Sequence, residues 1–418
     1  MLLNKQSICV ILLSFIIAKF SLKVNIMTTL ILFFLILGLL VFVHEFGHFI
    51  AARKSGMKVY EFALGFPPFI CGFYKDPKTK KLVWVTAKDA KKRALMAGGG
   101  KDVDESQEYP STLYSLNLIP LGGFCKIKGE NGEDAKDSDS FGYQKTWKKS
   151  IVLVAGVVMN FLLAAVLLAI GFGIGLPTDV SGGVEENAVL LEKPAVVIQH
   201  VEDNSPAKKA GLLLGDKVQK IDETVIDSAK TMTQYIKDHK EDVLLLHILR
   251  GEEHITAKAQ PAVVVAGEPV RLGVILADAA LVKYPWHIAW YKGFVSASYA
   301  LVGIFVSFFL LIKGLIFGQG LAFGVAGPVG IASIIGDSAR LGVPYLINIT
   351  AMISLSLAAM NILPIPALDG GRLFFVLAEK VIGRPVPLKY EQLAHTIGFL
   401  LLLFLIVIVT FRDIMGLF

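Results

Sequence analysis

Two histidines and a glutamate in the string Val-His-Glu-Phe-Gly-His have the spacing of a hydrolytic metal site. His44 and His48 are four residues apart, so a helix places both imidazoles on one face, where they can bind the same metal ion. Glu45 stands beside the first histidine, where it can accept a proton from a water molecule at the metal. The preceding residues 28–43 carry no charge, and ionisable groups at the end of such a run are costly in a bilayer unless they serve a function. The pattern predicts metal-dependent hydrolysis inside a membrane.

Two histidines leave a catalytic zinc site one protein ligand short, because such sites use three protein ligands and a water. Asp369 is the best candidate for the third ligand, since it follows an uncharged run of 27 residues, 342–368. Pro364 and Pro366 break the helix before it, and the two glycines after it let the backbone turn tightly. The alternative is a helix-end carboxylate at the membrane surface. Because the two histidines need a third protein ligand, the metal-binding role of Asp369 is favoured.

Two asparagines in apolar runs, Asn160 and Asn361, are candidates for contact with a substrate. A transmembrane substrate must unwind before its peptide bonds can be cut, and side-chain amides can donate to and accept from its exposed backbone. The alternative is hydrogen bonding between helices of the bundle. The sequence leaves both roles open.

Two β-prone segments, 59–73 and 112–128, contain Gly65 and Gly122 among large apolar residues and prolines. They are expected to form strands and hairpins near the membrane face rather than a soluble core. The polar, lysine-rich residues 75–109 between them are expected to be a flexible excursion.

The composition indicates a polytopic α-helical membrane protein, because 54% of its 418 residues are hydrophobic and the mean hydropathy is +0.62. Four stretches are long enough to span a membrane: 28–52, 150–176, 343–368 and 393–411. A fifth apolar region, 287–336, is rich in glycine and interrupted by two lysines. It is expected to be a membrane-associated helix followed by a re-entrant loop, with a span as the alternative. His395, at the start of the last stretch, is expected to lie at the membrane interface.

The first 26 residues have several interpretations. Their short apolar core, 8–18, resembles a signal-peptide core or an uncleaved anchor. A mis-assigned start or a dispensable extension before Met27 is an equal alternative to a real span. The three cysteines, Cys9, Cys71 and Cys125, fit neither a disulfide framework nor a cysteine-based zinc site and receive no role.

Charge is unevenly distributed along the chain. Residues 53–149 hold 18 Lys and Arg against 12 Asp and Glu, whereas residues 177–286 hold 12 against 17. The positive-inside tendency therefore favours a cytoplasmic first loop and an extracytoplasmic second one. The net charge of +6 is explained by this bias, and nucleic acid is not expected as a partner.

Residues 185–275 are the one region expected to form a small soluble domain. β-type runs at 195–201, 217–221 and 243–249 surround a helical stretch, 228–238. Ser205, Pro206 and Gly211 have the positions of an N-cap, a first helical residue and a C-terminal stop. This layout resembles a PDZ domain of the kind attached to bacterial proteases, which binds extended peptides by strand addition. The alternative is a small β-rich domain without a binding role.

The order of these motifs resembles the site-2 protease family of intramembrane zinc metalloproteases, in its bacterial branch with the regulator of sigma-E protease. From Met27 onward the chain carries His-Glu-Phe-Gly-His, the PDZ-like insertion and then Asn-x-x-Pro-x-Pro-x-Leu-Asp-Gly-Gly. The resemblance implies that His44, His48 and Asp369 bind one zinc ion and that Glu45 is the general base. Asn160 matches the family's asparagine motif. Val157 stands where relatives often have proline, so a kink there is not expected.

The resemblance further implies a protease of the bacterial plasma membrane, with its active site toward the cytoplasm and its PDZ-like domain outside. Substrates would be single-span proteins already trimmed by a site-1 protease, such as anti-sigma factors or remnant signal peptides, admitted by the PDZ-like domain. The strands around Gly65 and Gly122 would pair with the unwound substrate. A membrane scaffold and a metal transporter are the alternative functions, although neither needs Glu45.

The expected architecture is about four transmembrane helices plus membrane-associated hairpins, with one inserted α/β PDZ-like domain. Its parts are an N-terminal extension or signal-like segment (1–26), a first membrane half (27–176), the PDZ-like domain (185–275), the membrane-associated helix and re-entrant loop (287–336) and a second membrane half (343–418).

Overall fold

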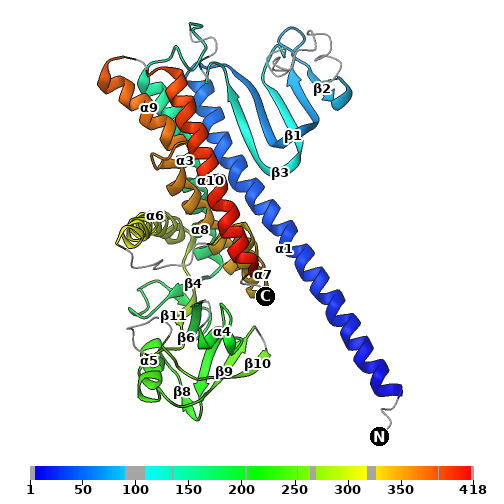
Figure 1. Ribbon diagram of the computed structural model, residues 1–418, viewed down its shortest axis with the longest axis vertical. Helices are drawn as coiled ribbons and strands as arrows, with labels where there is room; N and C mark the ends of the chain where they lie inside the picture. The colour runs from blue at the N-terminus through cyan, green and yellow to red at the C-terminus, as the bar shows by residue number, and fades with distance from the viewer. Residues whose placement is uncertain are drawn as a thin grey trace. The chain divides into compact units, whose positions relative to one another are not determined.

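The computed structural model describes residues 5–89, 109–130, 132, 136–202, 205–251, 253–263, 270–317, 326–384 and 386–415, with side chains from residue 26 onward except at Leu121. The helices are α1 (Lys5–Lys54), α3 (Thr146–Ile174), α4 (Pro206–Lys209), α5 (Ala229–Asp238), α6 (Trp286–Ile316), α7 (Pro328–Leu341), α8 (Val343–Ile362), α9 (Asp369–Ile382) and α10 (Leu388–Met415). The strands are β1 (Val59–Lys75), β2 (Leu82–Thr86), β3 (Leu113–Ile127), β4 (Leu176–Asp179), β5 (Val189–Leu190), β6 (Ala195–Val201), β7 (Lys217–Ile221), β8 (Thr224–Val225), β9 (Leu244–Arg250), β10 (Glu253–Ala259) and β11 (Val274–Lys283). Figure 1 shows their course.

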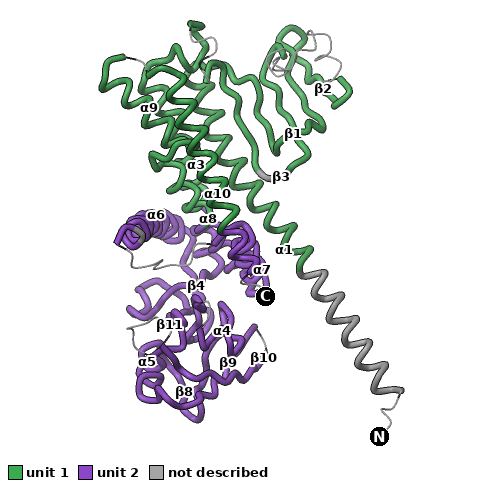
Figure 2. The backbone as a smooth tube through the Cα atoms, in the orientation of Figure 1, with its two compact units in different colours: residues 1–164, 353–408 green, residues 165–352, 409–418 purple. Residues whose placement is uncertain are grey.

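The chain forms two compact units, residues 1–164 with 353–408 and residues 165–352 with 409–418 (Figure 2). Most of the predicted flexible excursion lies outside the described residues, as do the glycines of 318–325 in the predicted re-entrant loop.

Five described helices are long and apolar enough to cross a membrane: α1 from Ile26, α3, α6 up to Gly314, α8 and α10. The four predicted spans coincide with α1, α3, α8 and α10. The span expected at 343–368 ends earlier, at Ile362, because Pro364 and Pro366 cannot continue the helix. The fifth candidate, α6, lies in the region whose course the sequence left open.

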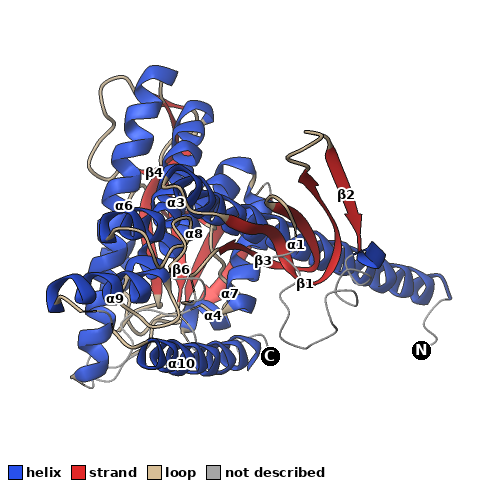
Figure 3. Ribbon diagram, turned by 90° about the horizontal axis from the view of Figure 1, so that it is seen from above, coloured by secondary structure: helices blue, strands red, loops and turns tan. Residues whose placement is uncertain are grey.

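A curved three-stranded sheet lies beside α1 in the first unit (Figure 3). Its order is β2-β1-β3, and both pairings are antiparallel, so the strands predicted at 59–73 and 112–128 are confirmed. Phe66, Leu116 and Leu118 expose large apolar side chains on it, which fits a sheet in contact with lipid. At its inner end Phe62 and Phe49 pack together with their ring centroids 5.1 Å apart. This aromatic core joins β1 to the histidine-bearing turns of α1.

The second unit contains a sheet domain, residues 176–283. Its eight strands follow the order β10-β9-β7-β6-β11-β4, with β5 and β8 as additional partners. The predicted strands and the predicted helix are confirmed as β6, β7, β9 and α5. The Ser205 hydroxyl caps α4 by accepting the amide of Lys208 at 3.1 Å, as its position in the sequence predicts. Fully buried aliphatic side chains form the core, among them Ile198, Leu212, Ile221 and Leu246.

Candidate metal centre

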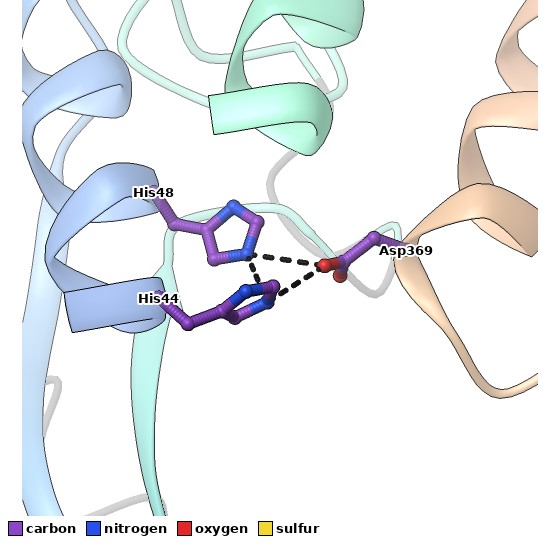
Figure 4. A group of neighbouring side chains, drawn as sticks. All are labelled: His44, His48 and Asp369. Atoms are coloured by element: carbon purple, nitrogen blue, oxygen red, sulfur yellow. Dashed lines mark hydrogen bonds and ion pairs between the residues drawn. The ribbon is translucent and has the colours of Figure 1, made fainter. Parts of the chain in front are cut away.

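The side chains of His44, His48 and Asp369 meet in the first unit (Figure 4). Nε2 of His44 lies 2.9 Å from Oδ2 of Asp369, and Nε2 of His48 lies 3.2 Å from the same oxygen. The two Nε2 atoms are 3.1 Å apart. Within the described ranges this is the one group of three such donors close enough to hold a metal ion. Residues 325 positions apart in the chain thus face a single point.

The spacing of the three donor atoms fits zinc. Zinc binds histidine nitrogen and carboxylate oxygen at about 2.0–2.2 Å in tetrahedral geometry, which places neighbouring donors roughly 3.3 Å apart. The three observed separations are within a few tenths of an ångström of that value. A three-donor set leaves the fourth position for water or substrate, as catalytic zinc sites require.

Each histidine has a second contact that orients its ring. Nδ1 of His48 lies 2.8 Å from the carbonyl oxygen of Val152 in α3, so Nδ1–H donates and Nε2 keeps its lone pair for the metal. Nδ1 of His44 lies 3.4 Å from Nδ2 of Asn160, whose Oδ1 is buried without a partner among the described residues. Rotating this amide by 180° lets Oδ1 accept from Nδ1–H of His44 in the same way.

Asn160 is only 1% exposed, and its backbone oxygen accepts the Ser354 hydroxyl of α8 at 2.8 Å. These contacts favour the alternative of hydrogen bonding within the bundle over direct contact with a substrate. Asn361 is half-buried at the end of α8. Gly65 and Gly122 lie in the β1–β3 sheet and do not join the histidine and aspartate cluster.

Small residues allow α3 to approach the two histidines. A methyl group on Gly156 would lie 2.5 Å from Nε2 of His48 and 2.7 Å from Nε2 of His44. On the facing helix, a methyl group on Gly47 would lie 2.5 Å from the carbonyl oxygen of Ala155. Any side chain at either position would therefore separate the helices or displace the imidazoles.

A tight loop between α8 and α9 presents Asp369. Ala367 has a left-handed φ of 80°, which is unusual for a residue with a Cβ. Methyl groups on Gly370 and Gly371 would lie 2.1 Å and 2.4 Å from the carbonyl oxygens of Leu363 and Ile365. Only glycines permit this approach. The tight turn expected at the two glycines after Asp369 is wrong, because both belong to the first turn of α9 and the turn precedes Asp369; the glycines serve close packing against that loop.

Ion pairs tie the segment after β3 to α9. Arg372, one turn after Asp369, pairs with Glu130. Within the same segment the Lys128 ammonium contacts Asp139 at 2.8 Å and holds the pKa of that carboxyl below its usual range. The Arg372–Glu130 pair thus joins the first turn of α9 to the segment after β3.

Glu45 is half-buried and lies toward β3. A methyl group on Gly123 would be 3.7 Å from its Cγ, which is ordinary contact distance. Glu45 is thus not one of the three donors of the cluster, and its side chain lies beside β3.

Comparison with known proteins identifies the family of this centre. The sequence matches peptidase family M50 over residues 32–81 and 82–405. The chain belongs to peptidase family M50. A putative zinc metalloprotease of Clostridium perfringens is 31% identical over 376 residues, covering 90% of this chain and 95% of that protein. The regulator of sigma-W protease RasP of Bacillus subtilis is 26% identical, covering 93% and 99%. Among solved structures, the PDZ domain of an SdrC-like protein from Listeria innocua covers 20% of this chain and 92% of its own, with 20% identity and a TM-score of 0.18.

This M50 chain is a zinc-dependent protease. The family match and the relatives named zinc metalloproteases agree with the donor set of the cluster. The resemblance to site-2 proteases is confirmed.

Two residues close to the M50 centre are not predicted from the sequence. Gly156 carries no chemistry of its own, and its role is visible only once α3 packs on α1. His395, expected at the membrane interface, contacts the loop before Asp369: its Nδ1 accepts the amide hydrogen of Ala367 at 2.8 Å. A histidine at the start of an otherwise apolar run is the only signal that the sequence offers for it.

Proposed function

We propose that this chain cleaves peptide bonds within the membrane-spanning segments of its substrates. The observation that carries the proposal is the metal-ligand cluster itself, since two of its members belong to α1, a helix apolar enough to span a membrane. Soluble proteases have no need to build a hydrolytic site on such a helix. His44, His48 and Asp369 would hold the zinc ion.

The protein's own groups divide the chemistry among them. When bound, zinc supplies a Lewis acid that lowers the pKa of water and polarises a carbonyl. Glu45 acts as general base for the attacking water and then as general acid toward the leaving amine. Nδ1–H contacts such as that of His48 with Val152 keep the ligand rings oriented.

The free edge of β3 is the proposed place for the unwound substrate. The N-terminal half of β3 pairs with β1 on both sides, but its C-terminal half, residues 123–127, pairs with β1 on one side only, and no described strand pairs with the other edge of that half. Gly123 of β3 lies beside Glu45, so an added strand would bring its carbonyls close to the general base. Gly65 and Gly122 shape this sheet, and Asn361 is retained as a candidate contact to substrate backbone.

We further propose that the substrates are single-span proteins trimmed beforehand by a site-1 protease, such as anti-sigma factors or remnant signal peptides, in a bacterial plasma membrane. The name of the Bacillus subtilis relative, a regulator of sigma-W protease, supports the anti-sigma class. The sheet domain would select trimmed chains, with the sheet domain outside the cell and the metal centre toward the cytoplasm.

Two substitutions test the site. Glu45→Gln should retain zinc but lower cleavage of a model transmembrane substrate by about 10²–10⁴-fold, the usual contribution of a general acid–base group. Asp369→Ala should lose zinc as well as activity. Zinc content and cleavage are measured on purified protein, with Glu223→Gln, an exposed turn residue, as the control. Wild-type cleavage by Glu45→Gln would refute the assignment.

A further inference from the structure

We propose that His395 is a positioning residue that holds Asp369 in place for the metal. The inference rests on the proposed role of Asp369 as a ligand. It concerns α10, which contributes none of the three donors.

The first observation is the hydrogen bond from the loop to the imidazole. The Ala367 amide donates to Nδ1 of His395 at 2.8 Å, and Ala367 lies two residues before Asp369. With φ of 80°, Ala367 is in a left-handed conformation that is strained for a residue with a Cβ. The hydrogen bond offsets part of this strain, since it satisfies an amide that would otherwise be left without an acceptor.

The second observation is a close approach of the same helix face. Gly398 lies three residues after His395, on the same side of α10. A methyl group on Gly398 would lie 2.4 Å from the carbonyl oxygen of Pro366. α10 therefore touches two consecutive residues of the loop, once through a hydrogen bond and once through bare backbone. Contacts of this kind select one loop conformation.

The third observation concerns the tautomer. Because Nδ1 accepts a hydrogen bond, it carries no proton, and the proton of the neutral ring is on Nε2. Nε2 is buried and has no partner among the described residues. His395 and Asp369 line the same cavity of about 380 Å³. Nδ1 is thus the atom that does the positioning.

This assignment separates the isosteric variants of His395. The side-chain oxygen of asparagine lies where Nδ1 does and can accept from Ala367, whereas the amide of glutamine extends to the position of Nε2. His395→Leu should lower zinc affinity about tenfold or more, the size of effect found for groups that orient metal ligands. His395→Asn should restore most of the loss, and His395→Gln should not.

Zinc affinity is measured by chelator competition on purified full-length protein, and the visible spectrum of the cobalt-substituted protein reports ligand geometry. A His395→Asn variant as weak as His395→Leu would overturn the proposal, as would wild-type affinity in His395→Leu. Asp369→Ala separates the two claims. If this variant keeps zinc, the proposed metal site is wrong. If it loses zinc while the His395 variants bind zinc as tightly as the wild type, only the positioning role is wrong.

A double variant distinguishes loss of the loop contact from simple misfolding. Glycine adopts a left-handed φ without strain, so adding Ala367→Gly to His395→Leu should recover part of the lost affinity. A double variant no better than His395→Leu alone would show that the histidine does not act through this loop.

Discussion

At the level of single residues, the metal centre requires a glycine at position 156 as well as its three ligands. Gly156 faces both imidazoles, and a methyl group there would lie within 2.7 Å of each Nε2. These are the atoms that would bind zinc. The added carbon would therefore displace the metal ligands themselves and not only neighbouring apolar side chains.

Gly156→Ala should therefore reduce zinc content sharply, although alanine favours a helix by about 1 kcal/mol over glycine. Gly38→Ala in α1 is the matched control, because a methyl group there meets nothing within 4 Å. It should keep zinc and activity. Metal analysis of both purified variants decides the question, and full zinc occupancy in Gly156→Ala would contradict the observed packing of α3.

The residues predicted from the sequence are those whose chemistry is explicit in a short motif. The spacing of His44 and His48 predicts that both bind from one helix face. The position of Asp369 after an uncharged run makes it the candidate third ligand. Gly156 and His395 are not predictable in this way, because their contacts join α3 to α1 and α10 to the loop before α9. Such contacts depend on helix packing, which has no local signature.

At the level of elements, the β1–β3 sheet is held in shape by backbone contacts at a glycine. Gly65 has φ of +85°, and a methyl group there would lie 2.9 Å from the carbonyl oxygens of both Asn117 and Ile119. The Asn117 side chain also donates to the carbonyl oxygen of Gly65 at 3.1 Å. β-propensity predicts the two strands but not this crossing point, since register irregularities run through the pair.

Gly65→Ala should combine left-handed strain with a steric clash, whereas Gly56→Ala should show the strain alone. Gly56 has nearly the same φ, +82°, with open space around it. The control should lose about 1–2 kcal/mol of stability with its cleavage intact. Gly65→Ala should lose more stability and cut a transmembrane substrate at least tenfold more slowly. Thermal unfolding in detergent and substrate cleavage report the two effects, and equal behaviour of the variants would count against a role for this sheet.

For the whole molecule, the metal centre determines how the chain must thread the membrane. His48 at the end of α1 contacts the beginning of α3 through Val152, and Asp369 follows the end of α8. α3 therefore leaves the side of the centre and α8 returns to it. If α3 and α8 both cross the membrane, as their length and composition allow, we expect residues 175 and 342 on the side opposite to the centre and an even number of crossings, or none, between them.

The end of α10 extends this constraint to α6. α10 starts beside the centre, where His395 meets Ala367, and near its other end Asp413 accepts the amides of Gly327 and Gly330 at 2.9 and 2.8 Å. Gly327 follows the end of α6 by only eleven residues. Length and composition make α6 a candidate span, and the membrane-associated helix expected from the sequence stays a prediction.

Cysteine labelling tests this threading in intact cells. In a variant without the three native cysteines, single cysteines are placed at the two ends of α6, Trp286→Cys and Phe317→Cys, both at exposed side chains. Val225→Cys marks the sheet domain and Lys78→Cys the loop between β1 and β2. Because the basic first loop is expected in the cytoplasm, a membrane-impermeant maleimide should label both α6 positions and Val225→Cys, and should reach Lys78→Cys only after permeabilisation. Labelling of Phe317→Cys together with Lys78→Cys would instead make α6 a full crossing and require residues 318–342 to return.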